Sequence, residues 1–395
     1  MVNWPELENK YYMHTIVRIP VTLVKGEGAR VWDDKGKEYL DFVCGLAVNC
    51  LGHCHPVVVD AIATQARTLI QTSNWYYTIP QIRLAELLVK NSCLDKVFVC
   101  NSGLEANEGA IKLARRYGHL KLNGAYEVIT TMGSFHGRSL ALTAASGQPK
   151  MHTPYVPLPV GFINVENNDI EAIKAATKEK TCAVMLELIQ AETGINLPDD
   201  DYPKKVREWC DDKGILLILD EVQTGVGRLG TLFGYQMYDV EPDIMTLAKG
   251  LGGGIPIGAV LAKEHAAVFV PGDHNSTFGG NPVTSATAYT TLKYIIDNNV
   301  VGNVKKVGKY LIEGLDKLKK KYSFITEVRG RGFLVAVEFN SDIGQKVLQD
   351  CLDKGLIVNK VKANAIRLVP PLIIGNQEVD EAIGILDKVF SGIVK

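Results

Sequence analysis

Residues 241–264 read EPDIMTLAKGLGGGIPIGAVLAKE, in which one short apolar run stops at Lys249 and a second begins at Ile257. Gly250 and the glycines at 252–254 separate the two runs. Short apolar runs bounded by glycines predict buried strands. A lysine at the end of such a strand is costly to bury unless it has a partner or a chemical task. The stretch fits either a lysine that forms a Schiff base or an ordinary lysine at a strand-to-loop boundary.

The chain before this stretch alternates between apolar runs and helical patterns. Strands are expected at residues 96–101, 126–131, 182–188, 215–221 and 244–248. Continuous Val, Ile and Leu runs that alternate with helices predict a mostly parallel sheet covered on both faces, which is an α/β fold. In such sheets ligands bind beyond the carboxyl ends of the strands. Ser102, Asp220 and Lys249 all fall at these ends, which an isolated boundary lysine would not explain.

The pattern divides the chain into three segments. Residues 1–55 contain a predicted β-hairpin whose turn is Asp33–Gly36, and residues 56–285 form the large domain. Residues 286–395 combine helices with shorter strands, which predicts a small α+β domain. Because a hairpin is not stable alone, we expect the N-terminal segment to pack with the small domain.

Composition favours small-molecule chemistry in a reducing compartment. The formal net charge is −1, so no overall field attracts the chain to nucleic acid or to an anionic membrane. No run of 18 uncharged apolar residues predicts a membrane span, and the N-terminus lacks the pattern of a signal peptide. The eight cysteines are scattered, without a CxxC pair. We therefore expect a cytoplasmic protein.

The segment 50–56, CLGHCHP, concentrates two histidines and two cysteines. A metal site is one interpretation, but no second cluster with zinc-ligand spacing follows it. A turn whose side chains cap the next helix, at 57–70, explains the segment better. We therefore expect no metal.

Two glycine-flanked segments carry candidate binding groups. Ser102 and Gly103 lie between a strand and a helix, where free N–H groups suit a phosphate, although a plain N-cap serine is the alternative. The loop 133–139, GSFHGRS, presents Phe135 and Arg138. An aromatic ring can stack on a flat ligand and an arginine can hold a carboxylate with two parallel hydrogen bonds, or the loop has an ordinary salt bridge.

Asp220 follows five consecutive Leu and Ile residues, so an unpaired carboxylate there would be driven neutral. A cationic ring nitrogen such as a pyridinium would satisfy it, and a cap of the following turn is the alternative. Glu187 and Glu192 lie in a similar strand-end setting. The loop 276–282, STFGGNP, adds hydroxyls and glycines, and Arg367 is a further cation in the small domain.

Taken in order, these motifs resemble the class III aminotransferases, which are fold-type I pyridoxal-phosphate enzymes, and within them the acetylornithine aminotransferases. The resemblance runs from IPVTLVKGEGARVWDDKGKEYLDF at 19–42 to AIRLVPPLIIGNQEVDEAI at 365–383. Its most specific motifs are LDEVQTGVGRLGTLF at 219–233 and LAKGLGGGIPIGA at 247–259.

The resemblance implies a pyridoxal 5'-phosphate site and a homodimer. The implied roles are a Schiff base with the cofactor for Lys249, pairing with the pyridinium nitrogen for Asp220, a position near the phenolic oxygen for Gln223, ring stacking for Phe135, and phosphate binding for Ser102 and Gly103. Thr277 would reach the phosphate of the neighbouring subunit, so that each active site needs two chains. Freed Lys249 would then act as general base and acid.

The implied substrates are N²-acetylornithine and 2-oxoglutarate, in arginine biosynthesis. Arg138 would hold the far carboxylate of acetylornithine or glutamate, and Arg367 only the near carboxylate of glutamate. An unpaired buried cation is costly, so with acetylornithine bound a carboxylate should neutralise Arg367, and the resemblance points to Glu192.

Two positions bear on the substrate. Gly45 stands where related ornithine enzymes carry a bulky aromatic, which leaves room for an acylated amine. Ile16 replaces the tyrosine or phenylalanine usual in acetylornithine enzymes and can neither hydrogen-bond nor stack as they do. The alternatives are another ω-amino acid aminotransferase (for succinyldiaminopimelate, ornithine, 4-aminobutyrate or carrier-linked lysine), a same-fold aminomutase or racemase, and a cofactor-binding fold kept for regulation.

Overall fold

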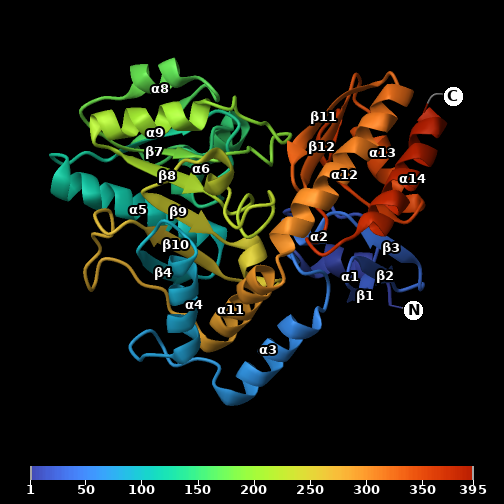
Figure 1. Cartoon of the computed structure of the whole chain (residues 1–395), viewed down its shortest axis with the longest axis horizontal. Helices are drawn as coiled ribbons and strands as arrows, with labels where there is room; N and C mark the ends of the chain where they lie inside the picture. Colours follow the sequence, from blue (N-terminus) through green and yellow to red (C-terminus); the bar gives the residue numbers. More distant parts are fainter. Residues whose placement is uncertain (1, 394–395) are drawn as a thin grey trace.

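A seven-stranded sheet forms the centre of the larger part of the molecule in this computed structural model, which describes residues 2–393 (Figure 1). The strand order is β4-β10-β9-β8-β7-β5-β6. The strands are β4 (Lys96–Cys100), β5 (Glu127–Thr131), β6 (Phe162–Val165), β7 (Thr181–Leu186), β8 (Leu216–Asp220), β9 (Ile244–Leu247) and β10 (Gly258–Ala262). Only β10 runs antiparallel to its neighbours, so the expectation of a mostly parallel α/β sheet is confirmed.

Strand β8 explains why the apolar runs are continuous. Leu216 and Ile218 pack in the cluster under α5 (Gly103–Lys121), whereas Leu217 and Leu219 pack in the cluster that contains residues of α9 (Tyr202–Lys213). Side chains alternate between the two faces of a strand. Since helices cover both faces, every position of the strand has to be apolar until Asp220.

Several short elements lie between β5 and β7, where the sequence pattern predicted no strand. They are α6 (Leu140–Ala145), α7 (Pro149–His152), the 3₁₀ turn η1 (Thr153–Tyr155), β6 and α8 (Ile170–Ala176). The helices have four to seven residues, which is too short for a clear apolar period. Strand β6 lies at the sheet edge with all four residues half-buried, so it lacks the apolar run of the central strands.

The C-terminal part is built on a four-stranded sheet of order β11-β12-β15-β14. Its strands are β11 (Ile325–Arg331), β12 (Leu334–Phe339), β14 (Asn359–Lys362) and β15 (Ala365–Leu368). Three helices complete it, namely α12 (Val300–Lys321), α13 (Gly344–Asp353) and α14 (Asn376–Ile393). In α12 the buried residues recur three or four apart, the amphipathic spacing that the sequence predicts.

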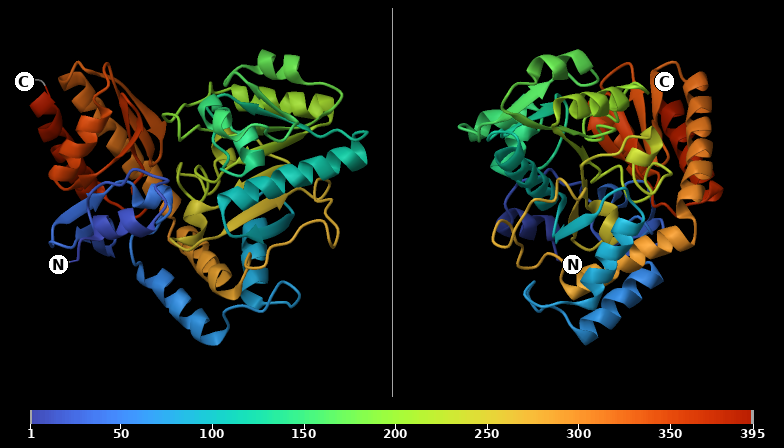
Figure 2. Two further views of the ribbon diagram at one scale, coloured as in Figure 1. Left: turned by 180° about the vertical axis from the view of Figure 1, so that it is seen from behind. Right: turned by 60° about the vertical axis from the view of Figure 1, so that its left-hand side comes forward.

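The N-terminal residues lie beside the C-terminal part (Figure 2). The predicted hairpin is present as β2 (Arg30–Asp33) and β3 (Glu38–Asp41), preceded by α1 (Trp4–Tyr11) and β1 (Leu23–Glu27). Strand β3 also pairs in parallel with β13 (Leu356–Ile357), which joins the two ends of the chain in one sheet. The domain boundaries after residues 55 and 285 stay predictions, and residues 1 and 394–395 lie outside the described chain.

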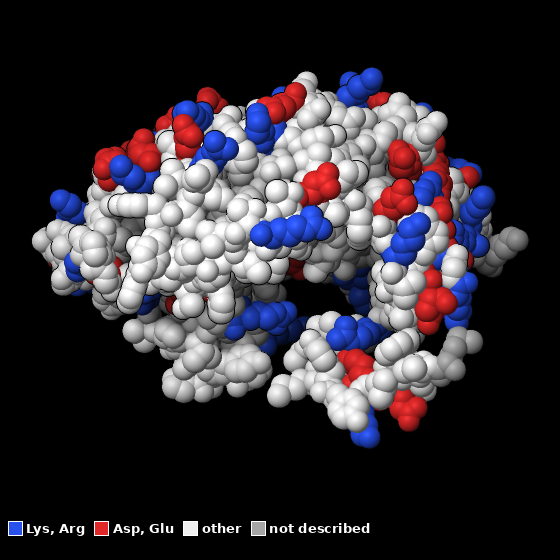
Figure 3. All heavy atoms as spheres, turned by 90° about the horizontal axis from the view of Figure 1, so that it is seen from below, with Lys and Arg blue, Asp and Glu red and all other residues white. Residues whose placement is uncertain are grey.

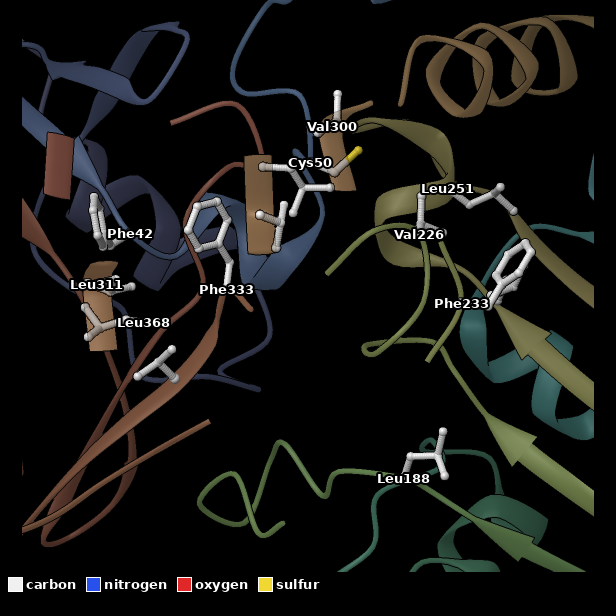
Figure 4. Packing of buried hydrophobic residues seen from close by; sticks show 14 of the residues in the cluster. Phe42, Cys50, Leu188, Val226, Phe233, Leu251, Val300, Leu311, Phe333 and Leu368 are labelled. Atoms are coloured by element: carbon white, nitrogen blue, oxygen red, sulfur yellow. The ribbon is translucent and has the colours of Figure 1, made fainter. Parts of the chain in front are cut away.

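Apolar packing continues from one part of the molecule to the other. Phe42, from the N-terminal residues, lies near Leu311 and Leu368 of the C-terminal part, and their cluster extends to Val226 and Leu251 beside the large sheet (Figure 4). Helix α11 (Pro282–Asp297) leads from one part to the other and packs on α3 (Pro56–Thr68) and α4 (Ile79–Lys90). Between residues 2 and 393, no helix has the length and apolarity needed to cross a membrane.

The segment 50–56 does not cap α3 with its side chains as expected. His55 is the N-cap residue, but its side chain makes no capping hydrogen bond. Pro56 is the first helical residue, a position where the missing N–H group costs the helix no hydrogen bond. His53 instead bonds through Nε2 to Asp41 Oδ2 at 2.7 Å, which ties the segment to the hairpin.

Gly258 tests how tightly the start of β10 packs under α5. A methyl group there would overlap Ser102 O and Cys100 Sγ, so Gly258→Ala should lower the free energy of unfolding by about 1–3 kcal/mol. Urea unfolding followed by circular dichroism measures the change. Gly384→Ala on α14 is the control, because nothing lies within 4 Å of the added methyl group. Equal stability of Gly258→Ala and the wild type would contradict this packing.

Candidate active site

A cavity of about 450 Å³ opens beyond the carboxyl ends of the parallel strands. Eight of the twelve residues that the sequence nominates line it, namely Ser102, Gly103, Phe135, Arg138, Glu192, Asp220, Gln223 and Lys249. They come from five separate stretches between residues 102 and 249 of the chain. The wall is mostly apolar with a few convergent polar groups, which is the usual character of a small-molecule site.

Lys249 lies half-buried at the first position of the 3₁₀ turn η2 (Lys249–Gly252), two residues beyond β9. Burial lowers its pKa from the ordinary 10.5, although the negative charge of Glu192 acts in the opposite direction. A lowered pKa increases the neutral, nucleophilic fraction of an amine. Its φ angle of 35° is uncommon for a residue with a side chain and is consistent with a constrained functional position.

Asp220 ends β8 and is only 4% exposed. Its Oδ2 accepts hydrogen bonds from Asn107 Nδ2 at 2.7 Å and from His136 Nδ1 at 2.8 Å. Its Oδ1 accepts one from the Val222 N–H at 3.0 Å. The carboxylate therefore has protein donors even without a ligand, and the turn-cap interpretation holds in part through Val222.

Two further ionisable groups surround Asp220. Burial acts to lower the pKa of His136, but the hydrogen bond and charge of Asp220 outweigh it and the pKa is raised. Burial, together with the charge of Asp220, raises the pKa of Glu187 to about 7. Glu187 Oε1 accepts the backbone N–H of Phe135 at 2.7 Å, which anchors the 133–139 loop to the end of β7.

The N-terminus of α5 forms another wall. Ser102 is its N-cap, and its Oγ accepts the Glu105 N–H at 3.1 Å, as the plain N-cap interpretation requires. The N–H groups of Gly103 and Leu104 lie in the first turn, where a helix offers unpaired donors and partial positive charge. Val222 Cγ1 lies 2.8 Å from where a side chain of Gly103 would begin, so glycine is needed for this close packing.

Phe135 and Arg138 lie at the mouth of the cavity. The Arg138 guanidinium carbon is 5.5 Å from the centre of the Phe135 ring, a cation–π contact. Arg138 is exposed and has no ion pair within residues 2–393. Its charge is available to an anion that enters the cavity.

Arg367, at 1% exposure, lies behind Glu192 and not on the cavity wall. Its Nη1 is 3.1 Å from Glu192 Oε1 and 3.4 Å from Gln223 Oε1, and its Nη2 donates to Asn359 Oδ1 at 2.8 Å. Burial raises the pKa of Glu192, but the Arg367 charge outweighs this effect and the pKa is lowered. A ligand reaches Arg367 only if the Glu192 side chain moves aside.

Three nominated residues lie away from the cavity of this chain. Ile16 is 63% exposed in the N-terminal segment, and Thr277 is exposed in the 276–282 loop. Gly45 lies in the short turn α2 (Cys44–Ala47) with a φ angle of 69°. Positive φ favours glycine whatever the ligand, so the missing side chain at Gly45 also has a conformational explanation.

The sequence predicts no role for Asn107 or His136, and it predicts Glu187 only as a carboxylate at a strand end. A buried polar residue on an otherwise apolar helical face was the available signal for Asn107, which lies beside Ala106 on α5. His136 was visible only as a neighbour of Phe135. Its contact with Asp220 spans 84 residues of sequence, and no local pattern encodes that distance.

The family model for class III aminotransferases matches residues 11–390. The acetylornithine aminotransferase of Caldanaerobacter subterraneus subsp. tengcongensis is 53% identical over 387 residues, which cover 98% of each chain. That of Methanocaldococcus jannaschii is 49% identical over 395 residues, which cover 100% of this chain and 99% of the relative.

Solved structures agree with this grouping. The ornithine aminotransferase of Toxoplasma gondii superposes with a TM-score of 0.95 at 32% identity, covering 98% of this chain and 94% of that one. The N-acetylornithine aminotransferase of Stenotrophomonas maltophilia superposes with a TM-score of 0.85 at 36% identity, covering 98% and 99%. Sequence and fold together make this chain a member of the class III aminotransferase family.

Proposed function

We propose that this chain is an acetylornithine aminotransferase. It transfers the δ-amino group of N²-acetyl-L-ornithine to 2-oxoglutarate and releases N-acetylglutamate 5-semialdehyde and glutamate. The main support in the structure is the Arg367–Glu192 ion pair at 3.1 Å beside a cavity that holds Lys249. Such a pair suits an enzyme whose two substrates differ in one carboxylate near the reacting carbon. The acetylornithine aminotransferases described above support the same activity.

Pyridoxal 5'-phosphate, the cofactor of this family, fits the residues present. Its phosphate suits the N-terminus of α5 at Ser102 and Gly103, and its aromatic ring suits the side chain of Phe135. Its ring nitrogen suits the buried carboxylate of Asp220, and its phenolic oxygen suits Gln223. When bound, the cofactor supplies an electron sink for the pair of electrons left at the substrate carbon.

Lys249 has two tasks in this proposal. Its Nζ holds the cofactor between turnovers and, once released by the substrate amine, takes the proton from the carbon that bears that amine. Burial, which lowers its pKa, keeps a neutral fraction of Nζ ready for both tasks. The carboxylate of Asp220 stabilises positive charge at the ring nitrogen.

Arginines select the substrates. Arg138, exposed at the mouth, binds the carboxylate far from the reacting amine, which both acetylornithine and glutamate possess. Arg367 binds the near carboxylate of glutamate after Glu192 has moved. With acetylornithine bound, Glu192 stays paired with Arg367, so no buried cation is left without a partner.

An ornithine aminotransferase is the second candidate, because the Toxoplasma gondii enzyme of that name superposes with a TM-score of 0.95. Gly45 is weaker evidence for acetylornithine over ornithine than its sequence position suggested, because its positive φ angle favours glycine with either substrate. An aminomutase needs no exchange of keto acid, so the Arg367–Glu192 pair disfavours it. The amino donor can be identified by an absorption experiment. Acetylornithine, succinyldiaminopimelate, ornithine and 4-aminobutyrate are added one at a time, and the donor is the amine that abolishes the cofactor absorption.

A homodimer completes the site in this proposal. The segment 69–79 exposes large apolar side chains, with Trp75 at 86% and Tyr77 at 96%. The Asn74 and Gln71 amides bind it to the loop of Thr277, where Phe278 is also exposed. The face seen from below has a broad uncharged area, and Lys and Arg side chains border its hollow (Figure 3). Covering such a surface by a second copy would bring Thr277 to the partner's phosphate site.

Arginine biosynthesis in the cytoplasm is the proposed setting. It follows from the proposed substrate, and the cysteines support the reducing compartment. All eight lie within residues 2–393 and are free thiols, six of them buried. Buried thiols of this kind act as small apolar side chains and need no oxidising environment.

The lowered pKa of Lys249 gives a prediction about pH. Apoprotein should bind pyridoxal phosphate covalently with a rate that rises with pH and reaches half its maximum well below 10.5, because deprotonation of Nζ limits the reaction. Stopped-flow absorption measures that rate. Glu192→Gln should move the midpoint lower still, because the Glu192 charge raises the Lys249 pKa. Lys249→Ala should show no visible band, and a midpoint at or above 10.5 would contradict the prediction.

The division of labour between the arginines predicts different effects on the two half-reactions. Arg138→Ala should lower kcat/KM about 10- to 100-fold with either amino donor, as expected for a lost charge-assisted hydrogen bond. Arg367→Ala should lower kcat/KM mainly with glutamate, and Glu192→Ala should raise kcat/KM for glutamate relative to that for acetylornithine. Single-turnover absorption changes give both values, with exposed Arg331→Ala as control. Equal losses in both halves for Arg367→Ala would refute the division.

Mixing subunits tests whether Thr277 acts across a dimer. Thr277→Ala should weaken binding of pyridoxal phosphate roughly tenfold, the cost of a hydrogen bond to a charged group. Refolding Lys249→Ala chains with Thr277→Ala chains should restore sites of wild-type affinity in the mixed dimers, because the intact Lys249 and Thr277 then meet. Absorption titration counts these sites. No restored site in dimers shown to be mixed would place Thr277 in the site of its own chain and contradict the prediction.

A further inference from the structure

A buried hydrogen-bond network surrounds Asp220, and the roles proposed above do not use it. Its centre is Asn107 on α5, only 2% exposed. Asn107 Nδ2 donates to Asp220 Oδ2 at 2.7 Å and to the backbone oxygen of His136 at 2.8 Å. Thr246 on β9, which is 0% exposed, donates from Oγ1 to Asn107 Oδ1 at 2.6 Å. The network therefore joins α5, β8, β9 and the 133–139 loop.

Asp220 and the His136 carbonyl fix the orientation of the Asn107 amide. If the amide were turned over, its oxygen would face these two groups, which both accept hydrogen bonds. The Thr246 hydroxyl can donate or accept, so it does not select the orientation. In the observed orientation it donates to Asn107 Oδ1 and holds the amide in place.

The Asn107 amide in turn determines which oxygen of the Asp220 carboxylate can accept a further hydrogen bond. Oδ2 already accepts hydrogen bonds from Asn107 and from His136. Within residues 2–393, Oδ1 accepts only the Val222 N–H, so the remaining accepting capacity of this buried carboxylate lies on Oδ1. Because Asn107 is neutral, it holds Asp220 without adding a charge to the group formed by Lys249, His136 and Glu187.

We propose that Asn107, held by Thr246, is a positioning residue for the cofactor, and that it fixes the Asp220 carboxylate so that Oδ1 remains for the ring nitrogen. This inference rests on the proposed pyridoxal phosphate site. Neither residue reacts with substrate in this proposal. Each acts through Asp220, and the chemistry required of Thr246 is a hydroxyl donor and not its methyl group.

Thr246 offers a pair of variants that separate hydrogen bonding from packing. Thr246→Val keeps the shape of the side chain but loses the hydroxyl, whereas Thr246→Ser keeps the hydroxyl but loses a methyl group. The dissociation constant of pyridoxal phosphate is measured for apoproteins of both variants and of Asn107→Leu. Exposed Asn376→Leu is the matched control, and thermal unfolding without cofactor verifies that each variant is folded.

Thr246→Val should weaken cofactor binding about three- to tenfold, as for a neutral hydrogen bond, and Thr246→Ser should bind as the wild type does. Asn107→Leu should weaken it about 10- to 100-fold, because the lost bond is to a charged group. Weaker binding by Thr246→Ser than by Thr246→Val would make the role one of packing and overturn the proposal. A wild type that binds no pyridoxal phosphate would instead overturn the proposed function.

Discussion

Removal of charge from water is the constraint on which the site depends. Asp220 and Arg367 are nearly inaccessible, and a buried charge without a partner is among the most costly features a protein can contain. The two receive different compensation. Asp220 has donors from α5, the 133–139 loop and its own backbone, all themselves fixed. Arg367 is balanced by Glu192, whose side chain lines the cavity and is one-third exposed. Asp220 therefore keeps its hydrogen-bond donors, whereas Arg367 can exchange Glu192 for another carboxylate.

The fold supplies this arrangement by ending apolar strands at one edge of the sheet. Strand β8 is buried along its whole length and is apolar until Asp220, whereas the buried strand β9 contains one polar side chain, Thr246, whose hydroxyl is hydrogen-bonded to Asn107. Helix α5 begins at the same edge and brings both its free N–H groups and, one turn later, Asn107. The C-terminal part adds Arg367 from β15, its second strand from one edge. Residues of both parts of the chain thereby come together at one site, with Arg367 behind the cavity wall.

The sequence alone predicts the features that depend on neighbouring residues or on a known motif. The mostly parallel sheet follows from continuous apolar runs, and Lys249, Asp220 and Ser102 follow from where those runs end. The antiparallel direction of β10 was not predictable, because a reversal of direction leaves the pattern of one buried strand unchanged. The contacts of Asn107 and His136 could not be predicted, because their partner, Asp220, is remote in the chain. Ile16 and Thr277 were nominated by resemblance alone, and both lie outside the cavity of a single chain.

Strand β10 also sets the distance between two strand ends at the cavity. It lies between β4, which leads into Ser102, and β9, which leads into Lys249. Neighbouring strands are about 4.8 Å apart, so these two strand ends are separated by about 10 Å. A molecule held by the helix end and by the lysine must therefore have a matching length, whatever side chains β10 carries. The backbone thus sets the separation of the two strand ends, and the side chain of Lys249 covers part of that distance.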